Sequence, residues 1–238
     1  MAVEQVITEF TIHHKNLIFA ILFGTIPALL WLYFWLREDR FHPGPRWPII
    51  VTFFAGVGTG ALLLALAPQL KHISFSLQEE KIFFFALVEE FAKFFVVFIV
   101  DYKSPYFSEP IDYAIYLISG SLGFAAFENV LYLAHPSVIE NIPYMIETGM
   151  FRFLGSTILH GVLAAILGLI IGFVFYKNTF TKIVFAGIGL GVVSILHTLY
   201  NYFIMERVSL NGFLALGILW VISLIVISLF EKVRMIRN

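Results

Sequence analysis

Two adjacent carboxylic acids and a nearby lysine lie inside one of the most apolar stretches of this sequence. Residues 82–100 read IFFFALVEEFAKFFVVFIV, in which only Glu89, Glu90 and Lys93 are charged. Lys93 comes four residues after Glu89 and three after Glu90, so on a helix it can reach either carboxylate. A carboxylate held in apolar surroundings can act as a general base that takes a proton from water. The stretch therefore indicates a site for attack of water on a carbonyl group.

These three charges make the stretch costly to place in a membrane by itself. On an insertion scale, a charged side chain at a helix centre costs about 2.5 to 3.5 kcal/mol, whereas Leu, Ile, Phe or Val returns about 0.3 to 0.6 kcal/mol. The three charges therefore offset the large apolar residues around them. We expect the two acids to face polar side chains of neighbouring helices.

Polar neighbours of this kind occur in three other apolar stretches. Glu128 lies in GFAAFENVLYLA, and His197 and Asn201 lie four residues apart in HTLYN. Arg152 lies near the membrane surface, and we expect its long side chain to extend toward that surface. It begins a series of polar residues at four-residue steps, which share one slowly turning helix face: Arg152, Ser156 and His160.

Counting residues from the ends of the stretches places these groups at one depth. Adjacent membrane helices alternate in direction, and each residue advances about 1.5 Å along the axis. Five ionisable groups from four helices then fall roughly 9–15 Å below the same membrane face: Glu89, Glu90, Glu128, His160 and His197. This alignment predicts one shared polar site.

Two kinds of chemistry suit part of this set. Glu128, His160 and His197 form a His₂Glu set, the ligand class of catalytic zinc sites that keep an open position for water. Alternatively, the imidazoles donate hydrogen bonds to a developing oxyanion without any metal. The sequence does not separate these alternatives. It does exclude thiol chemistry, because the chain has no cysteine, and it contains neither HExxH nor GxSxG.

The composition indicates the fold class. Of the 238 residues, 60% are hydrophobic and 13% are charged, whereas a soluble domain is nearer half and a quarter. Apolar runs of about 20 residues, each long enough to cross about 30 Å of hydrocarbon, recur along the chain. We predict an all-α polytopic membrane protein, a single domain over residues 1–238 with about seven transmembrane helices in one bundle. The predicted spans are roughly 16–36, 47–69, 82–100, 111–134, 150–176, 183–205 and 212–230.

The connections and charges predict an orientation. The connections are short, and we expect the longest, residues 134–149, to be a loop because it contains Pro136 and Pro143. With the N-terminus outside, nine Lys and Arg residues fall inside and four outside, which predicts N-out and C-in and places the polar layer near the outer face. A net charge of -1 gives no basic surface for nucleic acid.

Three spans contain pairs of glycines at four-residue spacing. Such pairs mediate homodimerisation or close packing between helices of one chain, and we expect packing here. The pairs are Gly56 and Gly60, Gly168 and Gly172, and Gly187 and Gly191.

The polar motifs, taken in order, resemble those of the PrsW family of intramembrane proteases. Residues 89–93 match its EExxK motif, residues 124–128 match FxxxE, and His160 and residues 197–201 match its later histidine motifs. The distantly related CAAX-processing and bacteriocin-processing proteases have EExxxR and FxxxH instead. This chain has Lys and Glu at the distinguishing positions, which favours the PrsW branch.

The resemblance implies an integral membrane peptidase of a prokaryotic cell membrane that cleaves a membrane-anchored protein near the bilayer surface. The implied substrate is a signalling regulator such as an anti-sigma factor. The family is often labelled metalloprotease, with zinc as the implied metal, whereas related glutamate-type proteases are argued to work without one. We therefore expect either a bound zinc ion or a metal-free glutamate mechanism.

By analogy with the family, each motif residue has an expected role. Glu89 is the base, Glu90 assists it, and Lys93 holds the glutamate pair. The residues that bind the metal or stabilise the oxyanion are Glu128, His160 and His197. Asn201 helps at the oxyanion only.

Two other classes of function also suit intramembrane acids and imidazoles. A proton-coupled transporter uses Glu, His and Lys within spans as a proton relay, although here the polar layer stays near one face. A catalytically idle binding or immunity protein could use the same scaffold. The variant Glu89→Gln separates these classes, because an enzyme loses cleavage while an idle binder keeps its function.

Overall fold

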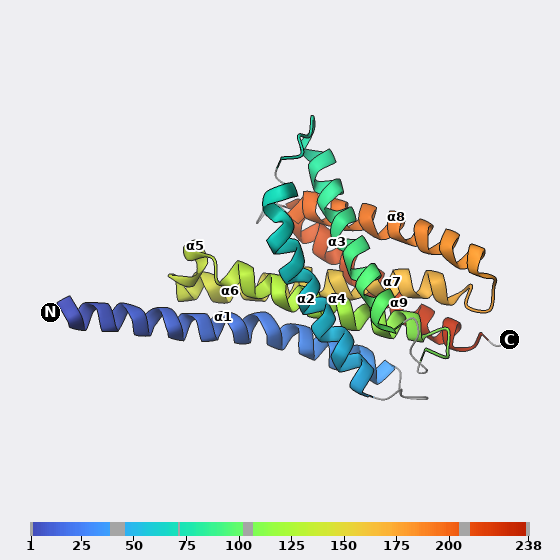
Figure 1. The fold of residues 1–238 in the computed structure, drawn as a ribbon, viewed down its shortest axis with the longest axis horizontal. Helices are drawn as coiled ribbons and strands as arrows, with labels where there is room; N and C mark the ends of the chain where they lie inside the picture. Colours follow the sequence, from blue (N-terminus) through green and yellow to red (C-terminus); the bar gives the residue numbers. More distant parts are fainter. Residues whose placement is uncertain (1, 39–45, 71, 102–106, 205–209, 237–238) are drawn as a thin grey trace.

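A computed structural model gives the arrangement of this protein and describes residues 2–38, 46–70, 72–101, 107–204 and 210–236. Every regular element in these residues is helical (Figure 1). The elements are α1 (Ala2–Glu38), α2 (Arg46–Leu70), α3 (Gln78–Asp101), α4 (Asp112–Leu133), α5 (Pro136–Ile139), α6 (Ile142–Phe151), the π-helical turn η1 (Arg152–Ser156), α7 (Thr157–Gly172), α8 (Thr179–Ile204) and α9 (Leu210–Arg234). The all-α prediction is confirmed.

Six helical segments of the described chain are long and apolar enough to cross a membrane. They correspond to the predicted spans except the one at 82–100. That span is part of α3. Any 18 consecutive residues of α3 include Glu89, Glu90 and Lys93, which is more charge than an independent span carries. The polar side chains of α3 need the neighbouring helices, as the insertion energies indicate.

Helix α4 forms the centre of the bundle. It packs most extensively against α2, α7 and α1, and most of its residues are buried (Figure 1). Small residues allow this close approach, because a Cβ at Gly123 would overlap the carbonyl of Phe53 on α2. Burial of α4 on several sides fixes the depth of Glu128, which lies on its last turns.

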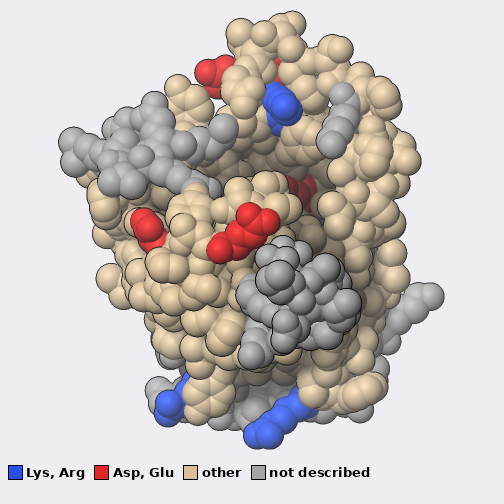
Figure 2. All heavy atoms as spheres, turned by 90° about the vertical axis from the view of Figure 1, so that its left-hand side faces the viewer, with Lys and Arg blue, Asp and Glu red and all other residues tan. Residues whose placement is uncertain are grey.

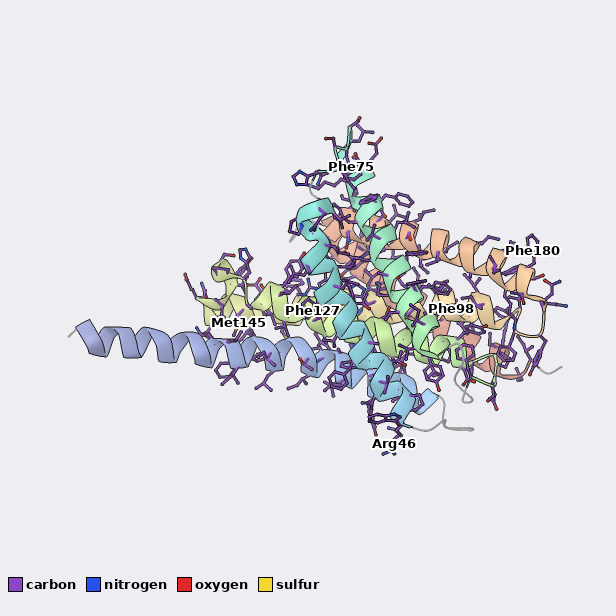
Figure 3. All side chains as sticks on the ribbon, in the orientation of Figure 1. Arg46, Phe75, Phe98, Phe127, Met145 and Phe180 are labelled. Atoms are coloured by element: carbon purple, nitrogen blue, oxygen red, sulfur yellow. The ribbon has the colours of Figure 1, made fainter. Side chains whose placement is uncertain are left out.

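The glycine pairs behave as packing sites in two of the three cases. A Cβ at Gly56 would overlap the backbone of Gly120 on α4, and one at Gly60 would come within 2.6 Å of the Phe127 ring. Figure 3 shows Phe127 beside α2. The pair at 168 and 172 likewise meets the backbone near the start of α4. By contrast, a Cβ at either glycine of the pair at 187 and 191 would contact none of the described residues within 4 Å.

The predicted loop at 134–149 is wrong, since most of it is helical. Asn141 accepts a hydrogen bond from the backbone of Tyr144 and starts α6, while His135 starts α5 in the same way. Pro136 and Pro143 lie in the first turns, where proline is favoured because the missing N–H has no helical partner. The prolines therefore begin helices here and do not mark a loop.

The fifth span begins earlier than predicted. Helix α6 continues through η1 into α7, giving one 31-residue helical segment from Ile142 to Gly172 in place of residues 150–176. The start of α1 and the end of α9 lie at opposite ends of the molecule (Figure 1). The orientation itself stays a prediction, and five of the basic residues behind it lie outside the described residues: Arg40, Lys71, Lys103, Arg207 and Arg237.

Candidate active site

A pocket of about 550 Å³ lies between α3, α4, α6, η1, α7, α8 and α9. Figure 2 looks at the end of the molecule where α5 and α6 lie, and it shows a hollow with acidic and basic side chains around it. The volume suits a short segment of a larger substrate or a small ligand. Glu89, Glu128, His160, His197 and Asn201 all line this pocket.

The two glutamates on α3 have different surroundings because successive residues of a helix point in different directions. The side chain of Glu89 is 25% exposed and reaches the pocket. That of Glu90 is 2% exposed and lies behind the pocket wall, where its Oε1 is 2.6 Å from Lys93 Nζ. The two carboxylates, either of which the spacing allows Lys93 to reach, are therefore divided into a pocket acid and a buried acid.

Glu90 also fixes the tautomer of His197. His197 Nδ1 is 2.8 Å from Glu90 Oε1. Because an ionised carboxylate only accepts hydrogen bonds, Nδ1 carries the proton. The neutral imidazole then has its lone pair on Nε2, which is 3.9 Å from Glu89 Oε2.

Lys93 fixes the tautomer of His160 in the opposite sense. Lys93 Nζ lies 3.0 Å from His160 Nδ1 and 5.0 Å from the centre of the Phe124 ring. An ammonium has only donors, so Nδ1 accepts and Nε2 carries the proton. His160 Nε2 therefore donates to Glu128 Oε2 at 3.1 Å.

Glu128 is held by Arg152, which the sequence places on one helix face with Ser156 and His160 but which the family motifs do not include. Arg152 donates through Nη2 to Glu128 Oε2 at 2.9 Å and to Ser156 Oγ at 3.1 Å, and through Nε to Asn129 Oδ1 at 2.6 Å. Its guanidinium also lies 4.0 Å from the centre of the Tyr132 ring. The expected extension of Arg152 toward the membrane surface is replaced by these contacts, made from the first residue of η1.

Of the three clustered acids, Glu89 is the one with no ion pair to a lysine or arginine among the described residues. Glu90 is paired with Lys93 and Glu128 with Arg152. Among the described residues Glu89 has no hydrogen bond, and its contact with His197 is long at 3.9 Å. A carboxylate that is ionised, partly exposed and not engaged by a donor can accept a proton from a water molecule in the pocket.

All seven residues singled out from the sequence come together at this pocket or directly behind its wall. Glu90 and Lys93 form the buried part, and Asn201 lies one helical turn after His197 on α8. The amide of Asn201 has no hydrogen-bond partner in the described part of the chain. It is therefore free to contact a substrate.

The three side chains expected as metal ligands are engaged with other partners. Both nitrogens of His160 have partners, and Glu128 is bound by Arg152. In the part of the chain that the structure describes, no three His, Asp or Glu side chains are placed to hold a metal ion. The arrangement therefore does not fit ligation by Glu128, His160 and His197 together, and the metal assignment stays a prediction.

Comparison with known sequences identifies the family. The profile described as "PrsW family intramembrane metalloprotease" matches residues 44–229, which include α2 to α8 and most of α9. No solved structure matches this chain significantly.

Individual relatives agree with this match. A protein called Protease PrsW from Oceanobacillus iheyensis is 31% identical over 84% of this chain and 91% of its own length. Those of the same name from Bacillus subtilis and Geobacillus kaustophilus are 27% and 31% identical over 75% and 63% of this chain, and 79% and 64% of their own lengths. The chain therefore belongs to the PrsW family and is an integral membrane protease.

Proposed function

We propose that this membrane protease hydrolyses a peptide bond of a membrane-anchored protein with Glu89 as the general base. The observation that supports this assignment is the contrast among the three clustered acids. Glu90 and Glu128 each bind a cation, whereas Glu89 faces the pocket without one. A general base must be free to accept a proton.

His197 complements Glu89 in holding a water molecule. Its Nε2 presents a lone pair 3.9 Å from Glu89 Oε2. A water between two acceptors donates one hydrogen to each, which directs its own lone pairs toward the pocket. Glu90 supports this function indirectly, because it keeps the His197 proton on Nδ1.

Hydrolysis then proceeds in two balanced steps. Glu89 takes one proton from the water while the water oxygen forms a bond to the carbonyl carbon, which gives a tetrahedral intermediate with a negative oxygen. The carbon–nitrogen bond then breaks, and the nitrogen leaves with its electron pair and receives the proton from Glu89. One water is consumed, a carboxylic acid and an amine are formed, and Glu89 returns to its starting state.

The negative oxygen of the intermediate needs hydrogen-bond donors. Both imidazole N–H groups are already donated to carboxylates, at Glu90 and Glu128. The amide of Asn201 remains available on the same wall as His197. We therefore assign Asn201 to the oxyanion and assign Lys93, Glu128 and His160 to holding the surrounding network.

The substrate proposal rests on position and on the family resemblance. The pocket is built from membrane helices, so a substrate must present its cleaved bond at membrane depth. We propose a protein anchored in the prokaryotic cell membrane, of the regulator class that includes anti-sigma factors. With the N-terminus outside, the cut falls near the outer surface.

A reconstituted cleavage assay tests this proposal. The purified protein in proteoliposomes is mixed with a library of quenched fluorescent single-span peptides, and mass spectrometry locates the cleaved bond. We expect the wild type to cleave some library members, and we expect Glu89→Gln to lower kcat by about 10²–10⁴-fold. Peptide binding should survive, because glutamine keeps the size of the side chain.

The matched control is Glu79→Gln, an exposed acid in the first turn of the same helix. It should cleave as the wild type does. Cleavage retained by Glu89→Gln would reject Glu89 as the base. No cleavage by the wild type would reject the protease mechanism. Proton flux in its place would favour a transporter, and peptide binding that survives Glu89→Gln would favour an idle binder.

A further inference from the structure

Tyr200 is a pocket residue that the motif spacing did not single out. It lies on α8, three residues after His197 and directly before Asn201. Residues three and four apart on a helix are neighbours on one face, so Tyr200 shares the wall that carries His197 and Asn201. All three line the pocket, and Tyr200 is 8% exposed overall.

The hydroxyl of Tyr200 has no hydrogen bond to any residue that the structure describes. The oxygen is not enclosed, because the buried side-chain polar atoms without a partner among the described residues are Trp31 Nε1 and Ser194 Oγ. Polar groups nearby are taken, since Arg152 and His160 are bound to Glu128. A free donor on the wall of a catalytic pocket is therefore available to a ligand.

Gly155 makes room for this hydroxyl. A Cβ at position 155 would overlap Tyr200 Oη and would also come within 3.0 Å of Leu216 on α9. Gly155 lies within η1, and single π-helical turns of this kind are frequent at functional sites. The missing side chain at position 155 thus leaves room for the phenol oxygen against the backbone of η1.

We infer that Tyr200 is a further catalytic residue, whose hydroxyl donates a hydrogen bond to the carbonyl oxygen of the cleaved peptide bond. This inference rests on the proposed function. Together with the amide of Asn201 it supplies two donors on one helix face, where the imidazole N–H groups supply none. Tyr200 keeps its proton throughout, so the balance of hydrolysis is unchanged.

The test compares Tyr200→Phe with wild type on the best quenched peptide from the library in proteoliposomes. Phenylalanine keeps the ring and removes only the hydroxyl. We expect kcat to fall by about 10²-fold, as when one oxyanion donor is removed, with KM changed less than about threefold. A peptide whose cleaved amide is replaced by a phosphinate resembles the tetrahedral intermediate, so Tyr200→Phe should bind it more weakly than the wild type by a similar factor.

The matched control is Tyr202→Phe, which removes the same hydroxyl two residues further along α8 from a side chain that is 47% exposed and does not line the pocket. It should behave as the wild type. A kcat for Tyr200→Phe within threefold of wild type, or an equal loss in Tyr202→Phe, would overturn this inference alone. If the wild type does not cleave, or if its cleavage does not depend on Glu89, the proposed function is overturned, and this inference with it.

Discussion

The polar layer of this protease has a pocket side and a buried side that differ in how their groups are satisfied. On the buried side, Glu90 and Lys93 have close partners at 2.6 to 3.0 Å. On the pocket side, Glu89 and Asn201 have no hydrogen bond to the described residues. The two glutamates are adjacent in sequence, yet they belong to different sides.

This difference separates positioning from chemistry. A buried charge is stable only when it is paired and hydrogen-bonded, so the buried side holds fixed tautomers and fixed side-chain positions. A reacting group must instead be able to exchange protons and meet a substrate. Variants of the buried side should therefore change stability first, and variants of the pocket side should change catalysis alone.

The variant Lys93→Met should show the largest effect on stability. It leaves the Glu90 carboxylate buried without its cation, and breaking a buried pair costs about 3–5 kcal/mol. Thermal or denaturant unfolding in detergent measures the loss. Lys81→Met, on the exposed first turn of α3, is the control. Equal stability of the two variants would show that the pair is not structurally important.

The variant Arg152→Lys should weaken the hydrogen bonds that hold Glu128 in place. An ammonium cannot replace a guanidinium that bonds Glu128, Asn129 and Ser156 at once. We expect kcat to fall about tenfold, or about 1.4 kcal/mol, because Glu128 and His160 lose their fixed positions. Arg46→Lys, at the exposed start of α2, should leave kcat unchanged. The same kcat in both variants would contradict a positioning role for Arg152.

The double variant Glu90→Met with Lys93→Met sharpens the comparison. Replacing a whole buried pair by apolar residues is often neutral, so stability should return to within about 1 kcal/mol of wild type. Cleavage should stay reduced, because His197 loses the acceptor at Nδ1. A double variant with full activity would show that Glu90 is dispensable for orienting His197.

Metal removal should have the smallest effect. In the arrangement described, His160 carries its proton on Nε2 and Glu128 is bound by Arg152, so we expect cleavage to survive chelation. The measurement is metal content of the purified protein together with cleavage before and after chelator. Loss of cleavage that zinc restores would show that these side chains change partners and ligate the metal.

Motif spacing predicted which side chains lie together around the pocket, for a physical reason. Charged and imidazole groups are costly in a membrane helix, so Glu89, Glu128, His160 and His197 stand out against apolar neighbours and indicate function. Arg152 was visible too, but its contacts were not, because a long side chain can either reach the surface or turn inward. Tyr200 gave no signal, since tyrosine is ordinary in membrane helices.

The sequence by itself determined the membrane class, most of the spans and the family motifs, because hydrophobic length and the cost of charge are properties of local composition. Only the tertiary structure decided which glutamate faces the pocket and where each imidazole carries its proton. Those properties depend on atoms of α4, α7 and α8 that meet α3 within hydrogen-bond distance. The starts of α5 and α6 follow from local caps and prolines in the sequence, whereas the contacts that Arg152 makes from the π-helical turn depend on the tertiary structure.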